Sequence, residues 1–143
     1  MRIFSVLAVV LGTGLATGLA TGLVGAAQAQ ALDCSTAMTQ LNMNTCAALD
    51  FEAADKDLNA AYARARTAMR RLDAGVSARQ AGAEVALRDA QRAWIPFRDT
   101  ACLAEGFLMR GGSAEPLLVF GCKARLTRQR AQDLWALAAG MEG

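Results

Sequence analysis

Histidine is absent from the 143 residues, proline occurs only twice, and aromatic residues make up 6% of the chain. Without histidine the chain cannot form imidazole-dependent catalytic triads or zinc sites, and it lacks the side chain that ordinarily titrates near neutral pH. Fifteen Lys and Arg residues against thirteen Asp and Glu give a net charge of +2. This balance does not indicate nucleic acid or an acidic lipid surface as a partner.

Several local motifs are missing as well. The sequence contains no Cys-x-x-Cys pair, no phosphate-binding glycine loop and no nucleophile elbow. We therefore expect neither a metal ion nor an organic cofactor.

The first 29 residues have the features of a signal peptide. Arg2 supplies a positive start, an apolar stretch follows, and an Ala-Gln-Ala cleavage site occupies positions 27–29. We expect export, cleavage after Ala29, and a mature single domain of residues 30–143 in the periplasm or outside the cell, with no membrane attachment. The alternative is a retained anchor, because residues 3–27 are long enough to cross a bilayer.

The first and third of three predicted helices have clear boundaries. Residues 40–72 lack Pro and Gly and place apolar residues at steps of three and four, with Thr39 as the N-cap and Gly75 as the stop. Pro116 is typical of a first helical turn and predicts the third helix over residues 116–140.

The second helix is predicted from a capping box. Ser77 and Gln80 have the required spacing and predict a helix over residues 78–109, kinked at Pro96. No segment alternates with the period of two that a strand needs. We therefore expect an all-α fold, a three-helix antiparallel bundle.

The four cysteines, all after the leader, predict two disulfides in an exported protein, although their number alone allows three pairings and free thiols remain an alternative. Cys102 and Cys122 are equidistant from residue 112 in the predicted turn, so they face each other in an antiparallel helix pair. Cys34 and Cys46 would lie about 18 Å apart within one helix. Cys34 must therefore fold back along the first helix, and we predict Cys34–Cys46 and Cys102–Cys122.

One cation on the second predicted helix needs a partner. Arg98 shares a face with Trp94 and Cys102, and we expect it to pair with Asp55 of the first helix. We interpret this polar pair as structural, fixing the register of the bundle, and a functional cleft built on it is the alternative.

Two runs of residues form an ordered series over about residues 34–137. The first run is Met43-Asn44-x-Cys46-Ala47 with Ala54-Asp55-x-x-Leu58-Asn59-x-x-Tyr62. The second is Gln91-Arg92-Ala93-Trp94-Ile95 and Arg98-Asp99, followed by Cys102, Glu105, Gly111-Gly112-Ser113, Cys122, Leu126-Thr127 and Arg130. This series resembles the LprI-like lysozyme inhibitor domain. The resemblance implies a small, helical, exported, disulfide-bearing bacterial domain, with lysozyme inhibition assigned to the family's namesake.

The sequence departs from that namesake at two places. Asp33 stands before Cys34 where lipid attachment needs a small residue, and Pro96 interrupts a helix expected to be continuous. These departures concern tethering and the helix kink, and they leave the implied fold unchanged.

The resemblance implies a binding protein and not an enzyme, with lysozyme or another peptidoglycan-cleaving enzyme as its partner. Lysozyme cleavage uses two carboxylates in a cleft, which a loop with a cation or N–H donors can occupy. The predicted turn Arg110-Gly111-Gly112-Ser113 has this chemistry and follows Cys102 closely. The alternative is that the glycines only form a tight turn.

Two other classes of function stay open. An envelope interaction module without inhibitory activity predicts an exposed apolar patch around Phe107, Leu108 and Leu117. An enzyme would need a pair of carboxylates, and the sequence offers Glu105 with Asp99 or Asp50 with Asp55. Charges at such spacings ordinarily form solvated helix faces or ion pairs.

Overall fold

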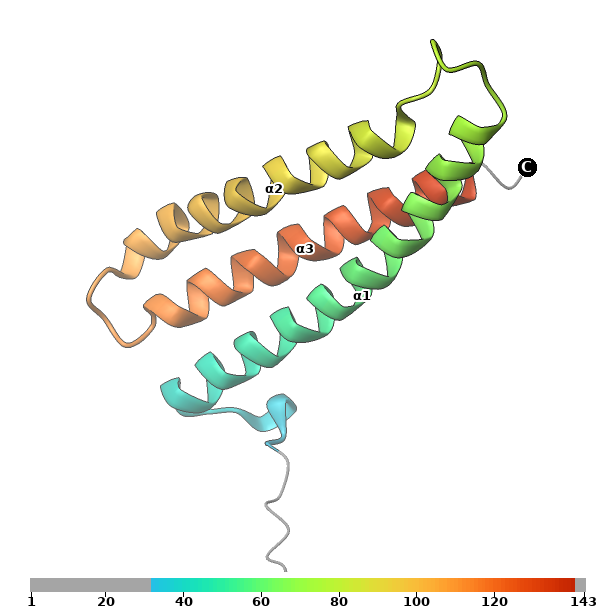
Figure 1. The fold of residues 1–143 in the computed structure, drawn as a ribbon. Coiled ribbons are helices and arrows are strands. Elements are labelled where there is room, and N and C mark those ends of the chain that lie inside the picture. Colours follow the sequence, from blue (N-terminus) through green and yellow to red (C-terminus); the bar gives the residue numbers. More distant parts are fainter. Residues whose placement is uncertain (1–31, 141–143) are drawn as a thin grey trace, which may run out of the picture. The chain divides into compact units, whose positions relative to one another are not determined.

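The structure is a computed structural model that describes residues 32–140, so the predicted signal peptide lies outside the described residues. Three long helices follow one another, with short 3-10 turns beside them (Figure 1). They are α1 (Gln40–Ala74), α2 (Ala83–Gly106) and α3 (Glu115–Ala139), and the 3-10 turns are η1 (Cys34–Thr36) and η2 (Phe107–Met109). No strand occurs within residues 32–140, and the all-α, three-helix prediction is confirmed.

The ends of α1 and α3 lie close to their predicted positions. The Thr39 hydroxyl accepts a hydrogen bond from the Asn42 N–H at 3.1 Å and caps the start of α1. At the other end of α1, the Gly75 N–H donates to the Leu72 carbonyl. Pro116 lies in the first turn of α3, where a missing N–H costs no helical hydrogen bond.

The predicted start of α2 at residue 78 is wrong. The Ser77 hydroxyl donates to the Gln80 side-chain oxygen at 2.7 Å and the Gln80 N–H donates to the Ser77 carbonyl, so these residues close a turn before the helix. The helix begins at Ala83, after Gly82 with a φ of 140°. That conformation favours glycine and separates the turn from the helix.

Asp73, near the end of α1, caps α2 from a distance. Its carboxylate accepts hydrogen bonds from the N–H groups of Gly82 and Ala83 at 2.8 Å and of Glu84 at 3.0 Å. These bonds lower the pKa of Asp73, because they stabilise the ionised form. The first N–H groups of α2 are therefore satisfied by a residue of α1. The Ser77–Gln80 pair does not cap the helix.

The far end of α2 agrees with the prediction, since η2 extends the helical run to Met109. Pro96 lies inside α2, and the helix continues through it.

Small side chains dominate the core of the bundle. In Figure 1, α3 lies between α2 and α1, and its packing against α1 is the most extensive helix contact. The core cluster contains several alanines, which let helix backbones approach closely, and a few larger side chains such as Leu58, Met69, Leu87 and Leu134.

Both predicted disulfides are present. Cys102 and Cys122 join α2 to α3 with a Cα–Cα distance of 5.4 Å, and Cys34 and Cys46 join η1 to α1 with 5.6 Å. The Cys102–Cys122 bond is buried, whereas Cys34 is exposed. Both disulfides lie at the end of the bundle that carries the α2–α3 turn.

Candidate functional site

The α2–α3 turn brings the four predicted loop residues together at one end of the bundle. We call residues 108–113 the tip. Gly111 has a φ of 76°, and the Gly112 N–H donates to the Met109 carbonyl at 2.9 Å. Arg110, Gly111, Gly112 and Ser113 are all exposed. The glycine at position 111 is required by its backbone conformation, which agrees with the interpretation of a tight turn.

A carboxylate at the start of α3 holds this turn. Glu115 accepts a hydrogen bond from Arg110 Nη1 at 2.7 Å and another from the Gly111 N–H at 2.9 Å. The Gly111 N–H and the Arg110 guanidinium lower the pKa of Glu115, because both stabilise the carboxylate. This contact was not predicted, although the Arg-x-x-x-x-Glu spacing across two glycines was a usable signal.

Arg110 remains available to solvent in spite of this partner. Its side chain is 58% exposed, and its guanidinium carbon lies 4.6 Å from the centroid of the Phe107 ring. The ring and Glu115 thus fix the direction of the cation, and the remaining N–H donors of Arg110 are unused by Glu115.

The base of the turn is fixed by contacts from three elements. Asn44 of α1 donates to the Ser113 carbonyl at 2.9 Å, and the Cys102–Cys122 disulfide lies behind the turn. Gly106 packs so closely that an added Cβ would lie 2.5 Å from a methyl carbon of Val119. Any larger residue at position 106 would therefore force Val119 or the backbone of the two helices to shift.

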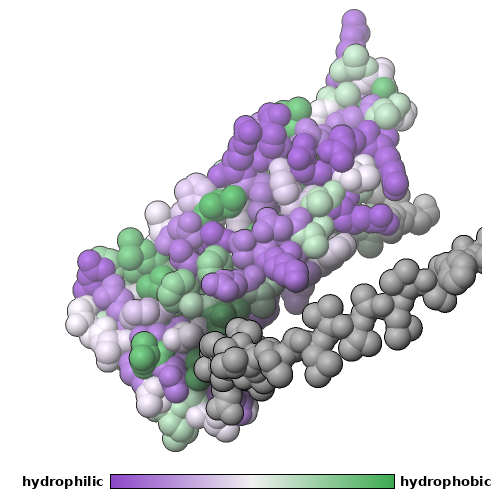
Figure 2. Space-filling model, turned by 60° about the horizontal axis from the view of Figure 1, so that its bottom comes forward, coloured by the Kyte–Doolittle hydropathy of each residue, from purple (hydrophilic) through white to green (hydrophobic). Residues whose placement is uncertain are grey.

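Exposed apolar side chains lie within the tip and beside it. Phe107, Leu108 and Met109 are 56%, 78% and 51% exposed, and Met38 and Leu41 before and within the first turn of α1 are also exposed. Figure 2 shows that hydrophobic side chains gather at this end of the molecule. Leu117 is only half-buried and lines a hollow next to the Cys34–Cys46 disulfide. This end of the bundle therefore exposes apolar side chains next to the Arg110 cation.

Arg98 lies away from this surface in a buried polar site. Its Nη1 is 3.3 Å from Asp55 Oδ1 and its Nε donates to Asp99 at 3.0 Å. The guanidinium carbon lies between two aromatic rings, 5.0 Å from the Phe51 centroid and 5.2 Å from the Trp94 centroid. The pairing with Asp55 and the shared face with Trp94 were predicted from the sequence, and the contacts with Asp99 and Phe51 were not.

The cation affects the pKa of the neighbouring Asp99 carboxylate. Burial raises the pKa of Asp99, but hydrogen bonds from Arg98 and Lys123 and the charges of both cations outweigh it, so that the pKa is lowered overall. The arrangement holds these charges in place between the helices.

The carboxylates that could serve an enzyme are each bound to a cation. Asp50 pairs with Arg128 and Glu105 with Arg125, while Asp55 and Asp99 pair with Arg98 as described. Within residues 32–140, no group of three potential ligands is placed to hold a metal ion, and none of the helices is long and apolar enough to span a membrane.

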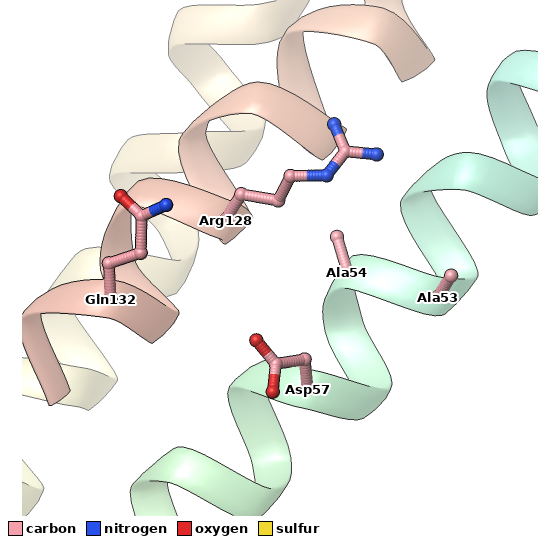
Figure 3. Close-up of a pocket in the computed structure, with 5 residues that line it drawn as sticks. All are labelled: Ala53, Ala54, Asp57, Arg128 and Gln132. Carbon is pink, nitrogen blue, oxygen red and sulfur yellow. The ribbon is translucent and has the colours of Figure 1, made fainter. Parts of the chain in front are cut away.

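A small groove between α1 and α3 was not predicted from the sequence. It has a volume of about 250 Å³ and is lined by Ala53, Ala54, Asp57, Arg128 and Gln132 (Figure 3). Its charged groups already have partners, because Arg128 pairs with Asp50 and Asp57 accepts a hydrogen bond from the Trp135 indole at 3.1 Å. The sequence carried a signal for this groove. Ala53 and Asp57, and likewise Arg128 and Gln132, are four residues apart and therefore lie on one face of their helix.

The fold and the tip define a small, all-helical, doubly disulfide-bonded domain with an ordered, partly apolar contact end. The chain belongs to the family described as "Lysozyme inhibitor LprI", whose sequence profile matches residues 32–134. It is also similar to an uncharacterized protein of Rhizobium meliloti (strain 1021), with 45% identity over 119 residues, which are 81% of this chain and 86% of that protein. No solved structure matches the chain.

Proposed function

We propose that this protein is an exported, non-catalytic binding protein that inhibits a lysozyme-type, peptidoglycan-cleaving enzyme through its tip. Membership of a family named for lysozyme inhibition supports the class of function. The observation that carries the role of the tip is the Arg110–Glu115 contact, which presents an exposed guanidinium on an ordered turn.

The chemistry of the tip fits the cleft of such an enzyme. Glycoside hydrolysis uses two carboxyl groups, and the acid of lysozyme lies in a hydrophobic pocket. Arg110 offers a planar set of donors, of which Glu115 uses only part, and a second carboxylate can bind the rest. Leu108 and Met109 supply exposed apolar surface beside this cation.

The order of the turn lowers the cost of binding. Glu115 holds the Gly111 N–H, Asn44 holds the Ser113 carbonyl, and the Cys102–Cys122 bond holds the helices behind them. A loop that already has its bound conformation loses less conformational entropy in a complex. This pre-organisation compensates for the weak steering that a nearly neutral protein gives.

Export is part of the same proposal. Two disulfides form and persist in an oxidising compartment such as the periplasm or the outside of the cell. The leader at residues 1–29 supplies the route, and peptidoglycan-cleaving enzymes act in the same place.

The test is a lysozyme-driven cell-lysis assay with the purified, oxidised protein. We expect the wild type to slow lysis and Arg110→Ala to need at least about tenfold more protein for the same effect, because central interface arginines often contribute 2 kcal/mol or more. Arg125→Ala is the matched control, since Arg125 is also exposed and has Glu105 as its ion-pair partner. Undiminished lysis at high molar excess of the wild type would refute the inhibitory function. Equal potency of Arg110→Ala would refute the role of the tip.

The exposed Phe107 and Leu108 favour a second candidate, an envelope interaction module that docks another exported protein without inhibiting it. Pull-down from periplasmic extract distinguishes the two. Recovery of a lysozyme-type enzyme supports inhibition, whereas recovery of other exported proteins alone, with no effect on lysis, supports the module.

A further inference from the structure

The outer side of α2 has a regular row of uncharged residues that no helix of the described chain covers. In Figure 1, α2 lies along one edge of the bundle, with α3 on one side of it. The row, which we call the α2 stripe, is exposed throughout and ends on the first residue of η2. It repeats at alternating steps of four and three residues: Ala86, Ala90, Ala93, Phe97, Thr100, Ala104 and Phe107.

Large apolar side chains make this stripe unusual for a solvent-facing surface. Phe97 and Phe107 are 60% and 56% exposed, and the neighbouring Leu103 is 47% exposed. The only polar member, Thr100, donates its hydroxyl to the carbonyls of Pro96 at 2.8 Å and Phe97 at 3.1 Å. Contiguous apolar surface of this kind marks an interaction site.

The spacing of the stripe identifies the kind of partner. Alternating steps of three and four keep one seam of a helix facing another helix, as in a coiled coil. At a rise of 1.5 Å per residue the seam is about 30 Å long. Neither a strand nor a small molecule would match its length and spacing. The stripe therefore fits a second α-helix.

We propose that this second helix is α2 of another copy of the same chain, packed antiparallel about a two-fold axis that passes between residues 98 and 99. In this register each large residue faces a smaller one. Phe107 faces Ala90 of the other copy, Phe97 faces Thr100, and Ala93 faces Ala104. A two-fold axis of this kind repeats each contact twice, as in an isologous dimer.

The sizes of the side chains exclude the parallel arrangement. In a parallel pair each residue meets its own copy, so Phe97 would meet Phe97 and Ala93 would meet Ala93. The seam would then hold two overfilled phenylalanine layers among loosely filled alanine layers, which packs poorly.

The area available predicts a weak dimer. Phe97 and Phe107, which are 60% and 56% exposed, together offer about 200 Å² of side chain per copy, since a whole aromatic side chain presents about 150–250 Å². A contact made by one helix of each copy is therefore small, in the class below about 1,200 Å² to which weak, reversible complexes belong. Dimerisation should therefore depend on protein concentration in the micromolar range.

The first test is sedimentation equilibrium of the purified, oxidised protein over about 5–500 µM, a range suited to a small interface. We expect the average mass of the wild type to rise towards twice the monomer mass, and Phe97→Glu to stay monomeric. Leu49→Glu is the matched control, because Leu49 is an exposed leucine of α1 outside the stripe, and this variant should still dimerise. Circular dichroism verifies that both variants keep their helices.

A wild type that stays monomeric throughout would overturn the proposal and leave the stripe to a different protein. A dimer that Phe97→Glu leaves intact would also overturn it. The tip is unchanged in Phe97→Glu, so inhibition of lysis tests the proposed function independently.

Cross-linking tests the direction of the helices. Mixed Ala93→Cys and Ala104→Cys chains should form an intermolecular disulfide on mild oxidation, because the two-fold arrangement brings these positions opposite each other. Either variant alone should form none, since positions 93 of the two copies would lie about 16 Å apart along the axis and a disulfide needs Cα atoms about 5–6 Å apart. Cross-linking of each variant with itself and not in the mixture would show a parallel pair and refute the register.

Discussion

Replacing Arg98 by Met tests the role of the buried cation. Methionine keeps the length of the unbranched stem and removes the charge together with the donors to Asp55, Asp99 and the buried Thr127 hydroxyl. Replacing a buried ion pair with apolar groups is in other proteins neutral or even stabilising. The surroundings of Arg98 decide which outcome applies here.

The structure indicates a net loss of stability. Arg98 is only 7% exposed, whereas the side chains of Asp55 and Asp99 are each 41% exposed and can be solvated again in the variant. The penalty for leaving a buried charge unpaired is therefore small. What remains is the loss of charged hydrogen bonds, screened by solvent to about 1 kcal/mol each, and of two cation–π contacts of about 0.5–1 kcal/mol each. We expect a decrease of about 3 kcal/mol in the free energy of unfolding.

Urea denaturation of the oxidised protein measures this change. For a domain of this size, 3 kcal/mol corresponds to a midpoint roughly 2 M lower, at a slope of 1–2 kcal/mol per molar urea. Arg125→Met is the control, because the Arg125 side chain is 62% exposed and should lose less than about 1 kcal/mol. If Arg98→Met were within 1 kcal/mol of the wild type, the contacts of Arg98 would have no net value and the reasoning would fail.

The remaining predictions concern pH and the buried disulfide. The pKa values of Asp73, Asp99 and Glu115 are lowered in the folded state, so their stabilisation is complete above the unfolded values near pH 4 and is lost as the pH falls through the folded values. Thermal unfolding from pH 3 to 8 should show an acid-side loss that Glu115→Gln reduces, and a stability unchanged by acid would contradict these hydrogen bonds. Replacing Cys102 and Cys122 together by Ala opens a 20-residue link and should cost about 3 kcal/mol in the same urea assay. A cost below 1 kcal/mol would argue against the loop-closure explanation.

Local signals in the sequence predicted α1 and α3 closely and α2 poorly. Thr39, Gly75 and Pro116 act within one turn of the helix ends they define, so their effect can be read along the chain. The start of α2 depends on Asp73, which lies 9–11 residues before the N–H groups it binds. Ser77 and Gln80 have side chains suited to a helix cap, but in the structure they bond to each other and close a turn.

The candidate site shows the same division. The exposed glycine turn was visible in the sequence, and equal distances from its centre identified Cys102 and Cys122 as partners. The Glu115 carboxylate that holds Arg110 was not predicted: the five-residue spacing offered it as a candidate, but only the geometry of the turn brings the two groups together.

The sequence by itself determined the all-helical composition, the two disulfide pairings and the place of the turn, because these follow from spacing, capping and chain reversal. The tertiary structure alone decided which surfaces remain open. Whether Arg98 meets Phe51 of α1, and whether the α2 stripe is left uncovered, depends on the angles at which three helices pack. Side chains from different helices meet there, and no interval along the chain fixes their distance in space.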